Sequence, residues 1–157
     1  AECYSHLFKI QCVGLRFFTV YGPWGRPDMA TFIFTKNILE NKAIQIFNYG
    51  KMKRDFTYID DIVQGVLGVL KIKKKFCHKI YNLGNSHPEV LLEFIEVIEK
   101  NLNLKAKKTL LPIQPGDVSE TYADISESKK DFNFSPKTKV STGIPKFINW
   151  YKDYYKL

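Results

Sequence analysis

Hydrophobic and polar positions follow two different periods along this chain, and the two periods alternate. Apolar side chains recur every three or four residues, as on the buried face of a helix, over 29–41, 62–70, 91–102 and 142–155. Short runs rich in β-branched and aromatic residues, typical of strands, occur over 12–20, 44–47, 54–58, 79–83 and 106–111. A weaker helix is expected over 126–132. Strands that alternate with helices predict an α/β fold.

The ends of these elements follow from charge and from helix-breaking residues. Asp60 and Asp61 precede the apolar face over 62–70, where the helix dipole favours negative charge. Pro88 is expected in the first turn of the helix that continues to 102. Glycine and proline make 21–28 a loop.

Two features indicate that the chain is a fragment of a larger protein. Tyr4, Leu7 and Phe8 have helical spacing but follow no cap or turn, so the sequence is expected to begin inside a helix. Only the runs over 12–20 and 79–83 look like fully buried strands. A parallel sheet of two strands leaves edges and faces uncovered, so another part of the protein is expected beside it.

Composition excludes several classes of protein. The chain has 157 residues, of which 45% are hydrophobic and 25% are charged, which excludes a disordered or collagen-like protein. No apolar run is long enough to cross a membrane, and no secretion signal is present, so a cytoplasmic location is expected. Three scattered cysteines, Cys3, Cys12 and Cys77, fit a reducing compartment. The histidines are far apart, and no metal site is expected.

The net charge of +8 and the basic run over 71–79 raise the question of nucleic acid binding. This run follows a predicted helix, where cations complement the helix dipole, and a solvated loop explains it better. No nucleic acid partner is therefore expected.

Polar residues near strand ends are the candidates for chemistry. Thr19 ends the first strand, where ligands bind in open α/β sheets, and Arg26 follows in the loop. This arginine could bind a carboxylate or phosphate, or it could simply pair with Asp28, and the pattern favours neither. Arg54 could hold a diphosphate, and Asp117 could bind a ribose diol. On pattern alone, an ion pair from Arg54 to Asp55 and a turn role for Asp117 are favoured.

Several motifs together resemble the extended short-chain dehydrogenase/reductase family, and within it the UDP-glucuronate 4-epimerases. They occur in the family's order as LRFFTVYGPWGRPDMA (15–30), RDFTYIDDI (54–62), YNLG (81–84), QPGDV (114–118), YADIS (122–126) and FSPKT (134–138). The resemblance covers the whole chain. It implies the C-terminal part of an NAD(P)-binding Rossmann-type epimerase, with the last sheet strands and the small mixed α/β substrate-binding domain.

This resemblance also implies what the chain lacks. Residues 1–157 form the C-terminal substrate-binding half, in which 1–20 and about 60–100 also complete the Rossmann sheet. The N-terminal NAD-binding part, with its Gly-rich turn, is expected to be absent. The catalytic Tyr-x-x-x-Lys pair is expected upstream, because Tyr4 is followed by Phe8 where lysine is required. NAD is thus the cofactor of the full-length enzyme, and none is expected bound to this fragment.

Roles for individual residues follow from the same resemblance. Arg54 clamps the diphosphate, Asp117 binds the ribose, and the uracil is flanked by Gln45 and Phe47. Thr19 and Arg26 meet the sugar carboxylate, and such a charge-assisted bond favours glucuronate over glucose by about tenfold or more. Backbone at Phe17 approaches the nicotinamide. Gln114 stands where galactose epimerases have arginine, which leaves a second diphosphate contact open.

Three hypotheses remain at this stage. The first is the UDP-sugar-binding half of a UDP-glucuronate 4-epimerase of capsule or surface polysaccharide synthesis, inactive as this fragment. Its ligands are UDP-glucuronate and UDP-galacturonate, and formation of a homodimer stays open. The second is a fragment of a related UDP-sugar decarboxylase or dehydratase. The third is a non-catalytic protein, either a split-gene remnant or a basic nucleic acid binder.

Overall fold

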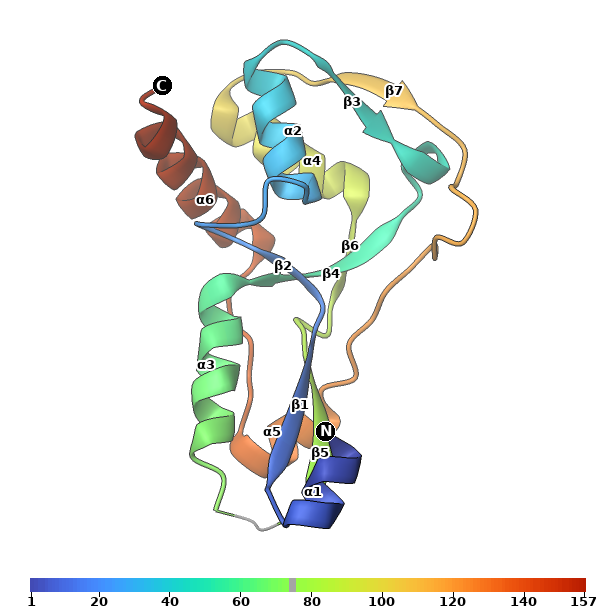
Figure 1. Ribbon diagram of the computed structural model, residues 1–157. Helices are drawn as coiled ribbons and strands as arrows, with labels where there is room; N and C mark the ends of the chain where they lie inside the picture. Colours follow the sequence, from blue (N-terminus) through green and yellow to red (C-terminus); the bar gives the residue numbers. More distant parts are fainter. Residues whose placement is uncertain (74–75) are drawn as a thin grey trace.

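The computed structural model describes residues 1–73 and 76–157 and confirms an α/β fold (Figure 1). The helices are α1 (Glu2–Phe8), α2 (Ala30–Leu39), the short 3-10 helix η1 (Phe47–Gly50), α3 (Ile59–Leu70), α4 (Leu91–Leu102), α5 (Ser126–Phe132) and α6 (Val140–Tyr155). The strands are β1 (Cys12–Phe17), β2 (Thr19–Tyr21), β3 (Ala43–Ile46), β4 (Lys53–Tyr58), β5 (His78–Leu83), β6 (Pro88–Val90) and β7 (Lys107–Leu110).

The lower part of the molecule in Figure 1 is built on one pair of strands. β1 and β5 are parallel, in a register that runs from Cys12 opposite His78 to Phe17 opposite Leu83. Helices α1 and α5 contact β5, and α3 contacts α5. Ile62, Leu83 and Phe134 form a small buried core here.

The upper part has a larger core, enclosed by α2, α4 and α6. β4 lies in the middle of a three-stranded sheet, parallel to β2 and antiparallel to β6. β3 and β7 form a separate parallel pair. Aromatic side chains dominate this core, and the rings of Phe56 and Phe94 stack with their centroids 3.8 Å apart. β4 thus joins the core of the upper part to α3 in the lower part.

The strand predicted over 12–20 is two strands. The ladder breaks at Phe18, whose N–H still donates to the carbonyl of Leu83 at 3.1 Å. Beyond it the chain leaves β5, and Thr19 pairs with Phe56 of β4 instead. β1 is also less buried than predicted, since Phe17 is 52% exposed. One continuous apolar run therefore forms two strands, which belong to two different sheets.

The prediction for Pro88 was wrong. Pro88 lies in β6, opposite Asp55 of β4, and α4 begins only at Leu91. Because β6 is an edge strand of its sheet, it tolerates a residue without an N–H group. The N–H of Leu91 donates to the carbonyl of Met52 at 2.9 Å, which ties the helix start to the strand region.

Two other expectations concern the surface. The basic run over 71–79 begins where α3 ends, but its residues 74 and 75 lie outside the described part of the chain. Within the described ranges, no helix is both long enough and apolar enough to span a membrane.

Candidate functional site

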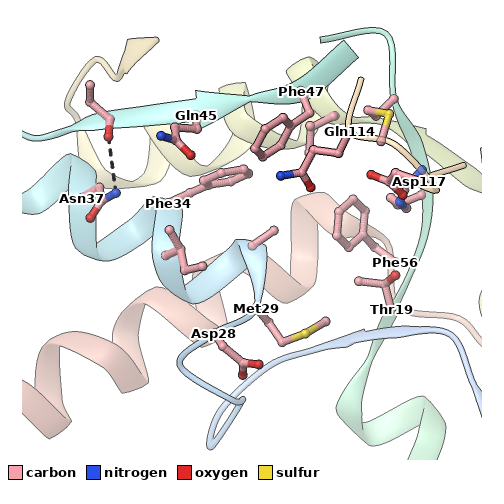
Figure 2. A pocket seen from close by; sticks show the side chains of 16 residues that line it. Thr19, Asp28, Met29, Phe34, Asn37, Gln45, Phe47, Phe56, Gln114 and Asp117 are labelled. Atoms are coloured by element: carbon pink, nitrogen blue, oxygen red, sulfur yellow. Dashed lines mark hydrogen bonds and ion pairs between the residues drawn. The ribbon is translucent and has the colours of Figure 1, made fainter. Parts of the chain in front are cut away.

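A cavity of about 610 Å³ is lined by side chains from α2, β3 and β4 and from the loop that follows β7 (Figure 2). The predicted site residues that line it are Thr19, Gln45, Phe47, Arg54 and Asp117. These five positions span almost one hundred residues of sequence. The fold therefore brings together most of the residues that the resemblance singled out.

The alternation of strand side chains explains how Gln45 reaches the cavity. Successive side chains of a strand point to opposite faces. Ile44 and Ile46 of β3 are completely buried in the core, which turns Gln45 between them toward the cavity. Phe47 follows at the start of η1, where Asn48 and Tyr49 have φ of 50° and turn the chain sharply.

One end of the cavity is charged. Arg54 Nη2 donates to Asp117 Oδ1 at 2.8 Å, and Arg54 Nη1 donates to the carbonyl of Lys53 at 2.9 Å. The alternative pairing of Arg54 with Asp55 was wrong. Asp117 also accepts a hydrogen bond from the N–H of Val118 at 2.8 Å. Its side chain therefore bonds the local backbone, as expected for a turn residue, and pairs with Arg54 as well. A guanidinium has five N–H donors, so Arg54 keeps further donors with which it can bind an anion.

The other end of the cavity is apolar and amide-lined. Figure 2 shows Phe34 and Gln45 close together, with Phe47 and Gln114 beside them, while Thr19, Phe56 and Asp117 lie at the opposite end. Aromatic faces with a few amide groups suit a flat ring that carries polar edges, such as a nucleobase. The cavity thus combines a place for a ring with a place for an anion.

Arg26 lies elsewhere. Its Nε donates to Asp28 Oδ1 at 3.0 Å, and both side chains are exposed, so the pairing with Asp28 is the one observed. The hydrogen bond raises the pKa of Arg26, and the same contact lowers the pKa of Asp28. Asp28 lines the main cavity, whereas Arg26 lines a neighbouring one of about 370 Å³.

Phe17 also lines that neighbouring cavity, together with Trp24 and Ile59. The structure therefore does not place Arg26 and Phe17 in one cavity with the other five predicted residues. Their roles toward a sugar carboxylate and a nicotinamide stay predictions.

Sequence reasoning missed several residues of the cavity wall. Phe34 and Asn37 lie three positions apart on α2 and face the cavity, and Asn37 Nδ2 donates to the carbonyl of Ala43 at 3.4 Å. Their shared helix face was visible in the spacing, but a cavity on that face was not. Met29 and Phe56 also line the cavity, and both were assigned to structural segments only.

Residues 1–84 match the NAD dependent epimerase/dehydratase family. An uncharacterized protein of Methanocaldococcus jannaschii is 56% identical over 151 residues, which are 96% of this chain and 46% of that protein. UDP-glucuronate 4-epimerase 2 of Arabidopsis thaliana is 44% identical over 171 residues, covering 99% of this chain and 39% of that protein.

A solved structure is similar as well. The UDP-glucuronic acid 4-epimerase from Bacillus cereus, in complex with UDP-glucuronic acid and NAD, has a TM-score of 0.91 and 38% sequence identity. The match covers 98% of this chain and 49% of the Bacillus cereus chain. This chain spans about half the length, or less, of the relatives it matches. Because the family match takes in 84 of the 157 residues, the chain belongs to the NAD dependent epimerase/dehydratase family.

Proposed function

We propose that this chain is the UDP-sugar-binding half of an NAD-dependent UDP-glucuronate 4-epimerase and has no epimerase activity by itself. The observation that carries the proposal is the pairing of Arg54 with Asp117 at the rim of a cavity that Gln45 and Phe47 also line. The ligands named for the Bacillus cereus structure, UDP-glucuronic acid and NAD, support it. A role in capsule or surface polysaccharide synthesis stays a prediction.

The chemistry of the cavity fits a nucleoside diphosphate. Arg54 would hold the diphosphate, since a guanidinium matches phosphate oxygens in a fork geometry. Asp117 would accept hydrogen bonds from the ribose hydroxyls. Gln45 would bind the polar edge of the uracil, with the ring of Phe47 against its face. Held in this way, the nucleotide fixes one end of the substrate and leaves the sugar near Thr19.

NAD is a different case. A dinucleotide pyrophosphate sits on a G-x-G-x-x-G turn between a strand and a helix. Among the described residues, the connections from β4 to α3 and from β6 to α4 are direct, and the loop from β2 to α2 has only Gly22 and Gly25 in a G-x-x-G spacing. The residues present do not form a dinucleotide site. Within this proposal, NAD binding and hydride transfer therefore belong to the N-terminal part of the full-length enzyme.

Calorimetric titration with UDP and UDP-glucuronate tests the binding half of the proposal. We expect both to bind, and inorganic phosphate to bind more weakly, because it leaves the uracil and ribose contacts unused. Absence of UDP binding at millimolar concentration contradicts the proposal. Tight duplex DNA binding that weakens steeply with salt, without a thermal shift by UDP, would favour a nucleic acid binder instead.

An activity assay tests the other half. The chain is incubated with UDP-glucuronate and NAD⁺, and the products are separated by chromatography. We expect no UDP-galacturonate, because the resemblance places the catalytic Tyr and Lys outside these residues. Formation of UDP-galacturonate would contradict the inactivity, and a decarboxylated or dehydrated sugar would favour the related enzymes.

A further inference from the structure

Asp55 is a buried carboxylate next to Arg54 on β4, and no ligand contact proposed above uses it. Its side chain is completely buried. Oδ1 accepts from the N–H of Asn85 at 2.6 Å, and Oδ2 accepts from the N–H groups of Ser86 at 2.9 Å and Ala123 at 3.0 Å. A carboxylate is buried at high cost unless such partners compensate it. Asp55 therefore joins three segments: β4, the turn after β5, and the chain at 123.

The third of these segments carries a residue of the candidate site. We call residues 117–123 the strap, which begins at Asp117 and ends at Ala123. The strap is tied to β4 at Lys53, whose N–H donates to the carbonyl of Ser119 at 2.9 Å and whose carbonyl accepts from the N–H of Thr121 at 3.2 Å. Asp55 N–H donates to Thr121 Oγ1 at 3.0 Å. Asp55 thus fixes the end of the strap opposite Asp117.

Close packing at Gly84 reinforces this joint. A Cβ atom on Gly84 would lie 2.3 Å from Ala123 Cβ and 3.3 Å from Asp55 Oδ1. Only glycine lets the turn after β5 approach the carboxylate this closely. The strap end therefore has little freedom to shift while Asp55 keeps its contacts.

We propose that Asp55 is a positioning residue of the UDP pocket: it fixes the strap along β4 so that Asp117 faces Arg54 at the cavity. Asp55 does not line the cavity and acts on the ligand only through the strap. The inference rests on the proposed binding of UDP. It predicts that loss of the Asp55 contacts weakens UDP binding in protein that is still folded.

Asp61 provides a matched control. It is also a buried aspartate, 6% exposed, and it accepts from the backbone N–H groups of Lys137 at 3.2 Å and Thr138 at 2.9 Å. It lies on α3 and does not line the cavity. A purely structural role predicts that Asp55→Asn and Asp61→Asn lower stability and leave the affinity of the folded protein unchanged.

The experiment measures the Kd for UDP by calorimetry at a temperature at which each variant is folded. We expect Asp55→Asn to weaken binding about tenfold, because the amide leaves at least one backbone donor without its acceptor. Asp61→Asn should change Kd less than about twofold. In an Asp117→Ala background, Asp55→Asn should add less than about twofold, because coupled residues are not additive. An unchanged Kd for Asp55→Asn, or full additivity with Asp117→Ala, overturns the proposal.

A second variant and a second measurement keep the test independent of folding and of UDP. If Asp55→Asn does not fold, Thr121→Val removes the hydrogen bond to the Asp55 N–H alone, and a Kd within about twofold of the parent's overturns the proposal. Hydrogen exchange by mass spectrometry reports on the strap without ligand, and Asp55→Asn should speed exchange over 117–121 while Asp61→Asn does not. Failure of the parent chain to bind UDP contradicts the proposed function, whereas an unaltered strap contradicts the role of Asp55.

Discussion

At the scale of single residues, the sequence predicted which side chains lie together at one cavity better than it predicted their partners. On local pattern alone Arg54 was expected to pair with its neighbour Asp55, yet it pairs with Asp117, 63 positions away. Adjacent residues of a strand face opposite sides, so a buried Asp55 could not easily serve an arginine at the cavity rim. The partner itself depends on the path of the strap, which no local pattern contains.

Replacement of Arg54 tests the anion site directly. Arg54→Ala removes a charge-assisted contact to the diphosphate and should weaken UDP binding by about 10- to 100-fold. Lys53→Ala is the matched control, because Lys53 is the preceding residue of β4 and its side chain lies on the surface in a 3.8 Å ion pair with Glu120, while the substitution leaves its backbone hydrogen bonds in place. We expect it to change Kd less than about twofold. Titration calorimetry measures both, and equal effects would argue against the clamp.

Arg26 carries a prediction about the sugar rather than the nucleotide. If its guanidinium meets the sugar carboxylate, Arg26→Ala should reduce the preference for UDP-glucuronate over UDP-glucose by about tenfold and leave UDP affinity unchanged. Competition titrations with the three ligands measure this preference. An unchanged preference would leave Arg26 with its observed partner, Asp28, as its only role.

At the scale of elements, periodicity predicted the helices well and the strand pairing poorly. The helix predicted over 126–132 has the observed bounds of α5, whereas the helix predicted with Pro88 in its first turn begins only at Leu91, as α4, and ends at Leu102 as predicted. Both helices are predicted from the pattern within their own segment, because helical hydrogen bonds join residues that are close in sequence. The break at Phe18 and the edge strand at Pro88 depend on which strand lies alongside, so local sequence could not supply them.

Glu99 links two elements in a pH-dependent way. It is buried near the end of α4, and it accepts from Ala106 N–H at 2.9 Å and pairs with Lys108 at 2.8 Å. Burial alone raises the pKa of Glu99, but the hydrogen bonds from Lys108, Ala106 and Lys105 outweigh it and hold this pKa below its usual value. Its stabilising effect is therefore present above the unfolded pKa and is lost as pH falls through the lower, folded pKa.

Thermal and urea unfolding test this link. At pH 7, Glu99→Gln should lower the free energy of unfolding by about 1–3 kcal/mol, because two lysines lose their acceptor charge. The difference from the parent should shrink as the pH falls below the usual range for a glutamate. Glu96→Gln, on an exposed position of the same helix, should change stability by less than about 0.5 kcal/mol. A Glu99→Gln deficit that stays constant down to pH 3 would contradict the assignment.

At the scale of the whole molecule, the sequence led us to expect another part of the protein beside a small parallel sheet, and the structure shows which edge of that sheet is unpaired among the described residues. In the described residues β1 pairs only with β5, and its other edge has no strand partner. Apolar side chains are exposed on two helices of this part, with Leu7 of α1 69% and Leu70 of α3 76% exposed. The sequence could indicate that apolar side chains would stay uncovered, but which of them are exposed follows only from the packing. The assignment of 1–20 and about 60–100 to a Rossmann sheet stays a prediction.

These exposed side chains predict that the 157-residue chain associates with itself as its concentration rises. Contiguous apolar surface favours association, and fully burying a leucine contributes about 1.5–3 kcal/mol. The double substitution Leu67→Glu, Leu70→Glu on α3 should therefore weaken self-association by at least about tenfold, as measured by sedimentation equilibrium. Leu157→Glu is the control, because Leu157 is 70% exposed but lies just beyond α6 at the other end of the molecule. If the control weakens association as much as the α3 variant, the exposed leucines of α3 are not the specific contact. The contact would then involve the exposed aromatic side chains near the end of α6, Tyr154 and Tyr155.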